Sequence, residues 1–346
     1  MLPIYEIIKK PKFILKGIAT YLPDWFGVFL PQHSSQFEGK GVRKEFDAND
    51  TARACYTLWL RFLVSLRKND KSFRVPVESV AEIGPGDSLG VGILALLTGS
   101  SHYYALDTVK TALNHSNLEM INVLVELLEK RTPIPDDSEF PKAYPKLDSY
   151  EFPHDILSEP LLEKSLDKER LKRIKKILEK LSEDSTLLRV HENDVSIDYI
   201  VPWIKENNLK GKFDLMVSNA TMEHVDDVEG AYKNMSKYIK KGGLFLHAID
   251  YKSHDTAGLW NGHWTYSEVI WRIIRGRSVY LINRIPHSFH IKIAKKYGFN
   301  ILLNQRYYKE NFLSLDDLVE PYRTMDPEDI QTSVGVIGGE LKNKNT

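Results

Sequence analysis

Two acidic residues lie within a glycine-rich stretch, EIGPGDSLG, at residues 82–90. The glycines are Gly84, Gly86 and Gly90. Glycines in a loop between a strand and a helix let a ligand approach the backbone closely. A dinucleotide-binding loop needs its third glycine where Leu89 stands, and the carboxylates of Glu82 and Asp87 are poor neighbours for a pyrophosphate. The loop therefore favours a positively charged ligand over a diphosphate.

Histidines and acids also gather where two later predicted strands end. HAIDYKSHD at 247–255 contains Asp250 and His254, and TMEHV at 221–225 contains His224. Histidine is the usual general base near neutral pH, and a neighbouring carboxylate can hold its ring in place. We predict that Asp250 and His254 form a base and its orienting partner, with His224 as a further catalytic candidate. A divalent metal held by Asp250, His254 and another acid is the alternative, but the ligand spacing is not diagnostic, so we predict no metal site.

Two further segments place aromatic residues beside hydrogen-bonding groups. LWNGHWTYSE at 259–268 contains His263 and Tyr266, and INRIPHSFH at 282–290 contains Arg284. This combination suits the face of a carbohydrate, so we predict that these three residues bind the acceptor substrate. A packed lid has the same composition and is the alternative.

Strand and helix patterns alternate along the chain and must position these residues. Strands are predicted at 79–84, 102–107, 186–194, 213–220, 244–250, 297–308 and 333–341, and helices at 47–68, 88–99, 117–130, 197–207 and 228–239. Repeated strand–helix units imply a mostly parallel sheet with helices on both faces, and the last two strands suit an antiparallel hairpin. The sequence therefore predicts an α/β fold in which the carboxyl ends of the strands face the ligand.

The domain organisation follows from where the alternation begins and pauses. We predict an N-terminal helical extension at 1–74 and one main domain at 75–346. Within that domain, six prolines and a charged helix interrupt the pattern at about 131–185. We interpret this segment as an insertion over the substrate side, and a decorative outer layer is the alternative.

Several segments, taken in order, resemble the motifs of class I S-adenosylmethionine-dependent methyltransferases. They are EIGPGDSLG at 82–90, YYALD ending at Asp107, HENDV at 191–195, FDLMVSNATMEHVDD at 213–227 and KKGGLFLHAID at 240–250. The resemblance implies a Rossmann-like fold, a seven-stranded sheet and S-adenosylmethionine as the cofactor. The predicted cofactor-binding residues are Glu82, Gly84, Gly86, Asp87, Asp107, Asn193, Asp194, Val195 and Asn219.

Each of these residues takes a role from the resemblance. Glu82 serves the cofactor's amino group, the glycine loop carries the methionine half, and residues 193–195 serve the adenine amino group. Asn219 belongs to the fourth-strand motif, which ends beside the methyl group. Asp107 also has an independent argument, because an acid roughly 20 residues past the loop can accept both ribose hydroxyls. That spacing suits NAD and S-adenosylmethionine alike.

A narrower resemblance concerns the acceptor. ARACYTLWLRFL at 52–63, the proline-rich insertion and INRIPHSFHIKIAKKYGFNI at 282–301 resemble bacterial methyltransferase-domain proteins associated with surface-polysaccharide biosynthesis. This implies O-methylation of a sugar or nucleotide-sugar, with a small molecule or glycan as acceptor. The alternatives are an NAD(P)-dependent sugar oxidoreductase and a non-catalytic, methyltransferase-like assembly subunit.

Composition narrows the partners and the location. The 47 basic and 47 acidic residues balance, so net charge indicates no nucleic-acid partner. Cys55 is the only cysteine, which excludes an internal disulfide and a cysteine-rich zinc site. No apolar run reaches the roughly 20 residues of a membrane span, and lysines interrupt the N-terminal segment. We expect a cytoplasmic protein, compatible with weak peripheral membrane association through that segment and with a homo-oligomer.

Overall fold

One sheet of eight strands organises the part of the chain that the computed structural model describes, namely residues 4–21, 48–109, 111–112, 116–184, 186–203, 208–278 and 281–342. The strands are β1 (Ser79–Ile83), β2 (His102–Leu106), β3 (Arg189–Glu192), β4 (Val195–Ile200), β5 (Phe213–Asn219), β6 (Ile239–Asp250), β7 (Phe299–Tyr308) and β8 (Thr332–Leu341). Their order in the sheet is β3-β4-β2-β1-β5-β6-β8-β7.

The strand directions confirm the predicted fold class. β4, β2, β1, β5 and β6 run parallel, whereas β3 pairs antiparallel with β4, and β8 pairs antiparallel with both β6 and β7. The fold is therefore a Rossmann-like α/β fold with a mostly parallel sheet and a terminal hairpin. The sheet has eight strands where seven were expected, because residues 195–200, most of which were predicted to begin a helix, form β4.

The prediction for the third strand–helix unit is wrong. The pattern indicated a strand at 186–194 and a helix at 197–207, but the strand that joins the parallel sheet is β4, which is buried at all its positions. Its valine, isoleucines and tyrosine suit a strand covered on both faces. β3 is a short outer strand, and the turn that joins it to β4 contains Asn193 at φ 52°.

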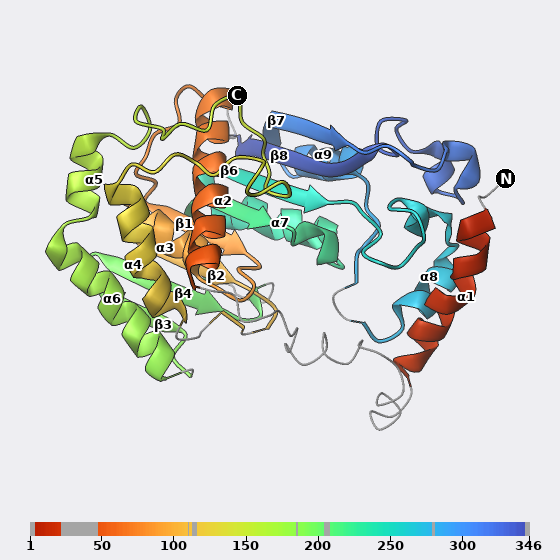
Figure 1. Ribbon diagram of the computed structural model, residues 1–346, viewed down its shortest axis with the longest axis horizontal. Helices are drawn as coiled ribbons and strands as arrows, with labels where there is room; N and C mark the ends of the chain where they lie inside the picture. Colours follow the sequence, from red (N-terminus) through yellow and green to blue (C-terminus); the bar gives the residue numbers. More distant parts are fainter. Residues whose placement is uncertain are drawn as a thin grey trace.

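Helices cover both faces of the sheet (Figure 1). One face carries α2 (Ala48–Asn69), α3 (Gly90–Leu97), α4 (Ser116–Glu129), α5 (Glu159–Ser165) and α6 (Lys168–Glu183), and the other carries α7 (Val228–Tyr238) and α9 (His287–Lys296). Successive strand residues point to opposite faces. Accordingly, Val80 and Tyr103 lie in the first hydrophobic core, while their neighbours Ala81 and Tyr104 lie in the second.

The two N-terminal helices pack in different places. In α2, Tyr56, Leu60 and Leu63 recur at helical spacing and are buried in the first hydrophobic core. α1 (Ile4–Ala19) instead packs on α8 (Glu268–Arg275), where Phe13 and Trp271 share a small core. α2 is thus part of the main fold. The boundary predicted at residue 74 stays a prediction, and the link at 22–47 lies outside the described residues.

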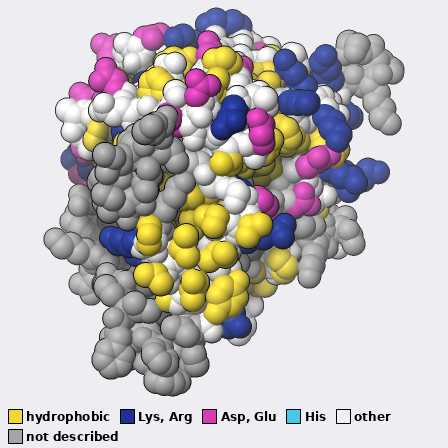
Figure 2. Space-filling view, turned by 90° about the vertical axis from the view of Figure 1, so that its right-hand side faces the viewer, with side chains coloured by type: hydrophobic (Ala, Val, Ile, Leu, Met, Phe, Trp, Pro, Cys, Tyr) yellow, Lys and Arg dark blue, Asp and Glu magenta, His cyan; other side chains and the backbone are white. Residues whose placement is uncertain are grey.

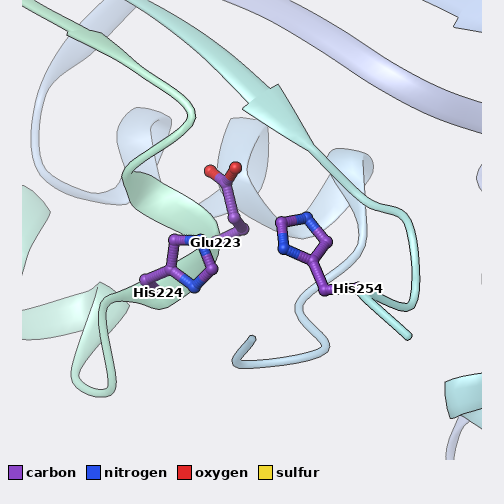
Figure 3. A group of neighbouring side chains, drawn as sticks. All are labelled: Glu223, His224 and His254. Carbon is purple, nitrogen blue, oxygen red and sulfur yellow. The ribbon is translucent and has the colours of Figure 1, made fainter. Parts of the chain in front are cut away.

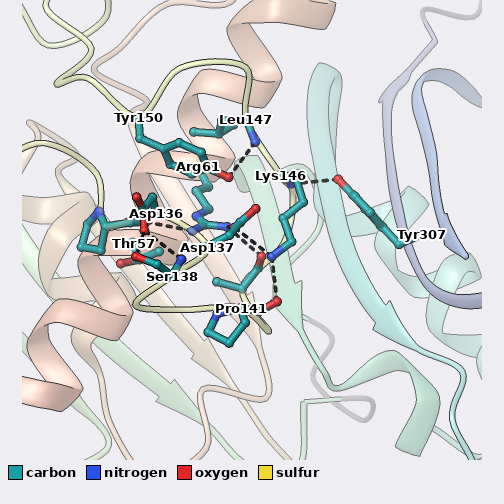
Figure 4. Close-up of polar contacts among 12 residues, drawn as sticks. Thr57, Arg61, Asp136, Asp137, Ser138, Pro141, Lys146, Leu147, Tyr150 and Tyr307 are labelled. Atoms are coloured by element: carbon teal, nitrogen blue, oxygen red, sulfur yellow. Dashed lines mark hydrogen bonds and ion pairs between the residues drawn. The ribbon is translucent and has the colours of Figure 1, made fainter. Parts of the chain in front are cut away.

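The proline-rich segment forms a strap across α2 (Figure 4). The buried Arg61 guanidinium of α2 donates hydrogen bonds to the Asp137 carboxylate at 2.9 Å and to the Pro135 and Ala143 carbonyls at 2.8 Å each. These bonds satisfy carbonyls that have no partner within a helix or strand. They fix an irregular segment without secondary structure of its own.

The strap also reaches the ligand-facing edge of the sheet. The backbone N–H of Lys146 donates to the Tyr307 hydroxyl at 2.8 Å. Tyr307 pairs with Val334 on β8, and Val334 pairs with Asp250 at the end of β6. This register places part of the insertion beside the carboxyl end of β6. A role over the substrate side stays a prediction.

Candidate active site

The glycine loop lies at the carboxyl end of β1 and contacts the turn after β5. Gly84 and Gly86 have φ values of +69° and +70°, which favour glycine. A Cβ on Gly84 would lie 2.4 Å from Thr221 Cγ2, whereas one on Gly86 would meet no described atom within 4 Å. Gly84 is therefore needed for close packing against Thr221, and Gly86 leaves open space beside the backbone.

A buried carboxylate stands directly before this loop. Glu82 accepts a hydrogen bond from the Tyr103 hydroxyl at 2.6 Å. Burial raises the pKa of Glu82 to about 7, although that hydrogen bond acts in the opposite direction. A ligand ammonium group would compensate its charge. Asp87, the second predicted acid of the loop, is exposed.

Asp107 follows the carboxyl end of β2, next to the end of β1. Its carboxylate accepts hydrogen bonds from the backbone N–H groups of Thr108 at 2.6 Å and Val109 at 3.4 Å. Burial raises its pKa, and these hydrogen bonds oppose the shift. Its backbone N–H donates to Ile200 at the end of β4, so the carboxyl ends of three strands meet here.

The adenine prediction for Asn193, Asp194 and Val195 is wrong. These residues form the β3–β4 turn and the start of β4, and the register pairs Ser196 with His102 at the beginning of β2. They lie at the amino end of the parallel strands, about five residues or roughly 16 Å of strand away from the ligand edge. Asp194 instead pairs with the guanidinium groups of two arginines on α6, Arg170 at 3.0 Å and Arg173 at 2.9 Å.

The end of β5 and the short turn after it carry three functional candidates. Asn219, the last residue of β5, is exposed. The 3₁₀ turn η4 (Met222–His224) follows and holds Glu223 and His224. Asn283 clamps this turn: its side-chain amide donates to the Met222 carbonyl at 2.7 Å and its backbone N–H to the Glu223 carbonyl at 2.6 Å.

The predicted Asp250–His254 pair comes together after β6. His254 Nε2 lies 3.7 Å from Asp250 Oδ2, and Lys252 Nζ lies 2.7 Å from the same oxygen. Burial raises the pKa of Asp250, but the contacts with His254 and Lys252 outweigh it and lower the value to about 2. Positive φ values at His254 (44°) and Asp255 (59°) turn the loop back toward the strand end. His247 points elsewhere, into the core.

The structure adds Glu223, which the sequence did not single out. Glu223, His224 and His254 lie together, with potential ligand atoms within 4.8 Å of one another (Figure 3). The two imidazole rings are 5.1 Å apart, edge to face. Glu223 is 2% exposed. Burial, and secondarily the charge of Asp250, raises its pKa to about 8. No spacing rule links residue 223 to residue 254, so only the fold reveals this group.

The predicted acceptor contacts of His263, Tyr266 and Arg284 stay predictions, and the packing of these residues favours the packed-lid alternative. These side chains are buried, with exposed fractions of 1%, 1% and 4%. The Arg284 guanidinium donates to the carbonyls of His263 and Tyr266 and lies over the Trp271 ring. The Tyr266 hydroxyl donates to the Thr256 carbonyl. They hold together the connection that contains η5 (Gly262–Thr265), as the packed-lid alternative requires.

Two further short turns lie between β7 and β8. The turns are η6 (Leu315–Asp317) and η7 (Tyr322–Thr324).

A surface hollow of about 530 Å³ lies between α2 and the strap and is lined by Arg53 and Tyr150 among others. None of the predicted site residues lines it. Among the described helices, none is long and apolar enough to cross a bilayer.

Residues 139–304 match a family model described as a methyltransferase domain. The match covers a little under half of the chain and begins after the glycine loop and Asp107. No curated protein matches the sequence. The matched residues are similar to a methyltransferase domain, which supports a methyltransferase with S-adenosylmethionine as its cofactor.

Solved structures show similarity in arrangement with little identity in sequence. Phosphoethanolamine N-methyltransferase 2 of Haemonchus contortus, in complex with S-adenosyl-L-methionine, is 14% identical at a TM-score of 0.40, over 88% of this chain and 61% of that chain. An S-adenosylmethionine-dependent methyltransferase from Mesorhizobium loti is 11% identical at a TM-score of 0.39, over 80% of this chain and 96% of that chain. Similarities of this strength do not say what the present chain acts on.

Proposed function

We propose that the protein methylates a hydroxyl group of a sugar or nucleotide-sugar in the cytoplasm, for use in a surface glycan. The observation that carries the proposal is the meeting of the glycine loop with the residues after β5 and β6. Thr221 contacts Gly84, and Glu223 and His224, which follow it on the η4 turn, lie beside His254. A polar cluster with two histidines beside the glycine loop suits an acceptor hydroxyl. The narrower resemblance supports a glycan as the acceptor.

The residues around the loop fit S-adenosylmethionine. The buried Glu82 carboxylate calls for a cationic partner, and the cofactor's amino group provides one. Asp107 offers a carboxylate at the neighbouring strand end, where the ribose hydroxyls can donate to it. Gly86 leaves its backbone open to a ligand. Glu82, Gly86 and Asp107 are therefore the residues that would hold the cofactor.

The chain's own residues would prepare the acceptor. When bound, S-adenosylmethionine supplies a methyl group on a sulfonium, and its transfer leaves a neutral thioether. A sugar hydroxyl is a very weak acid, so its proton must be removed as the oxygen–carbon bond forms. We expect His254 to take this proton, with its ring held by the Asp250 carboxylate at 3.7 Å.

Mass spectrometry of candidate nucleotide-sugars, incubated with the enzyme and S-adenosylmethionine, tests the proposal. We expect a mass gain of one methyl group on a hydroxyl-bearing acceptor. His254→Ala should slow turnover about 10²- to 10⁴-fold, the usual contribution of a general base, without changing the affinity for S-adenosylhomocysteine. The matched control is His154→Ala, because His154 is an exposed histidine on the strap.

Other outcomes would identify the alternatives. Hydride transfer with NAD(P) and no methylation would show a sugar oxidoreductase. Cofactor binding with no methylated product from any acceptor would show a non-catalytic subunit. A wild-type rate for His254→Ala would end the assignment of His254 as the base.

A further inference from the structure

We propose that Glu223, His224 and His254 form a binding site for a divalent transition-metal ion at the proposed acceptor site. The three side chains come from two segments, the η4 turn after β5 and the loop after β6, and their potential ligand atoms lie within 4.8 Å of one another (Figure 3). From the sequence alone we predicted no metal site. The alternative considered there was a metal held by Asp250, His254 and another acid. In the structure the acid that joins the two imidazoles is Glu223.

The strongest sign of a missing ligand is the Glu223 carboxylate. It is 2% exposed, and neither of its oxygens accepts a hydrogen bond of good geometry within the described part of the chain, although the backbone N–H groups of Glu223 and Asp250 lie near it. A buried carboxylate without a partner is costly, and such groups usually pair with a cation or coordinate a metal. Lys252, the nearby cation, is engaged by the Asp250 carboxylate at 2.7 Å. A metal ion would satisfy Glu223 directly.

The backbone holds these ligands in place. Asn283 donates hydrogen bonds to the carbonyls of Met222, Glu223 and Val225. These bonds fix the η4 turn, which carries Glu223 and His224. Asp250 Oδ2 lies 3.7 Å from one ring nitrogen of His254, so the second nitrogen is left for a metal. A carboxylate that orients a ligating histidine in this way is a common outer partner in metal sites.

The distances require only a modest contraction. Zinc bonds nitrogen and carboxylate oxygen at about 2.0–2.2 Å, which puts tetrahedral ligand atoms roughly 3.3 Å apart. The ligand atoms now lie within 4.8 Å of one another, so binding requires them to move closer, and the 29% exposed side chain of His254 has room to move. The partial exposure of this side chain also gives an ion access from solvent.

The donor set selects the kind of metal. Two imidazoles and one carboxylate suit Zn²⁺ or Mn²⁺, whereas Mg²⁺ prefers oxygen ligands and water. Three protein ligands leave a coordination position open for the acceptor hydroxyl, and a bound dication lowers the pKa of such an oxygen. This role rests on the proposed methyl transfer, and it makes His254 a metal ligand in place of a base.

Calorimetric titration of the full-length, chelator-treated protein with Zn²⁺ alone tests the site. We expect one saturable site, at least tenfold weaker in Glu223→Gln and in His254→Asn, and no comparable binding of Mg²⁺. His154→Asn is the matched control and should bind Zn²⁺ like the wild type. If the buried Glu223→Gln variant fails to fold, His254→Asn, on its partly exposed loop, decides the result.

Absence of a saturable site, or unchanged affinity in His254→Asn, would overturn the proposal. Methyl transfer that survives chelation at its full rate would overturn the metal's catalytic role and leave His254 as the base. Titration of the same samples with S-adenosylhomocysteine separates this failure from that of the proposed function. If that ligand binds and Zn²⁺ does not, the metal inference alone fails. If Zn²⁺ binds and that ligand does not, the proposed function fails and the metal site stands.

Discussion

Glu82 shows how the environment of one residue changes its protonation. Its carboxylate is buried, accepts one hydrogen bond from Tyr103, and has a pKa raised to about 7 from an ordinary 4.5. The folded protein therefore holds this proton more tightly than the unfolded chain does. The free enzyme loses stability as pH rises from about 4.5 to 7, because the unfolded chain ionises first. A cationic ligand reverses the preference by stabilising the ionised form.

We predict that the affinity for S-adenosylhomocysteine rises with pH. At pH 6 most of the free enzyme carries a protonated Glu82, and at pH 8 most is ionised and ready to pair with the ligand's ammonium group. With a pKa of about 7, the affinity should increase about tenfold between pH 6 and 8. Calorimetry across this range measures the slope. Glu82→Gln should flatten it, whereas the surface variant Glu126→Gln should keep it. An equal slope in Glu82→Gln would remove Glu82 from the amino-group site.

At the scale of the elements, the direction of the strands decides which residues can share a ligand. The carboxyl ends of β1, β2, β5 and β6 meet at one edge, which gathers Gly84, Asp107, His224 and His254 from distant parts of the chain. The motif HENDV predicts that Asp194 lies among these residues. In the structure Asp194 lies at the opposite edge of the sheet, because β4 starts there. Asp107 and Asp194, which flank the neighbouring strands β2 and β4, thus lie at opposite edges of the sheet.

This difference predicts opposite results for two similar substitutions. Asp107→Ala should weaken S-adenosylhomocysteine binding by about 1–3 kcal/mol, the cost of losing one partner of a buried or charged hydrogen bond. Asp194→Ala should leave the affinity unchanged and only lower the free energy of unfolding, because it removes ion pairs with two arginines of α6. Calorimetry and chemical denaturation measure the two effects. Weaker ligand binding in Asp194→Ala would contradict the placement of β4.

At the scale of the whole molecule, the face formed by α1 and α8 is notable for its exposed hydrophobic side chains. Hydrophobic side chains gather over α1 and α8, with basic side chains around them (Figure 2). The exposed hydrophobic residues here are Leu15, Ile18, Tyr21 and Val269. Lys12 and Lys16 lie on the same helix, α1. Apolar side chains with neighbouring lysines suit an anionic lipid surface, where the apolar groups insert and the cations meet headgroups.

We predict that the protein sediments with vesicles that contain phosphatidylserine and that high salt weakens this binding, since it screens the lysines. Replacing Leu15 and Ile18 together by serine should reduce the bound fraction severalfold. The matched control replaces Tyr308 and Phe312, which are exposed elsewhere, and should bind like the wild type. If the α1 variant binds vesicles normally but elutes at a smaller size in gel filtration, this face joins two copies of the chain instead.

The local features of the chain were accessible without coordinates. The glycine loop with Glu82, and Asp107 after the next strand, follow from spacing and strand periodicity, because both depend on neighbouring residues. The Asp250–His254 pair is similar, since four residues and a turn separate its members. The predictions of secondary structure were wrong where contacts between distant segments outweighed the local hydrophobic pattern. Residues 195–200 form a strand because both faces are covered, which periodicity alone does not show.

The sequence by itself therefore determined the fold class, the glycine loop and the strand ends that carry acids, because these depend on short-range spacing and hydrophobic period. Only the tertiary structure decided which strand ends meet, and hence that Glu223 and His224 face His254 and that Asp194 does not face Asp107. It also decided that Arg284 is buried among aromatic rings. The physical reason is that burial and proximity depend on contacts between residues far apart in the chain, and no local pattern records those contacts.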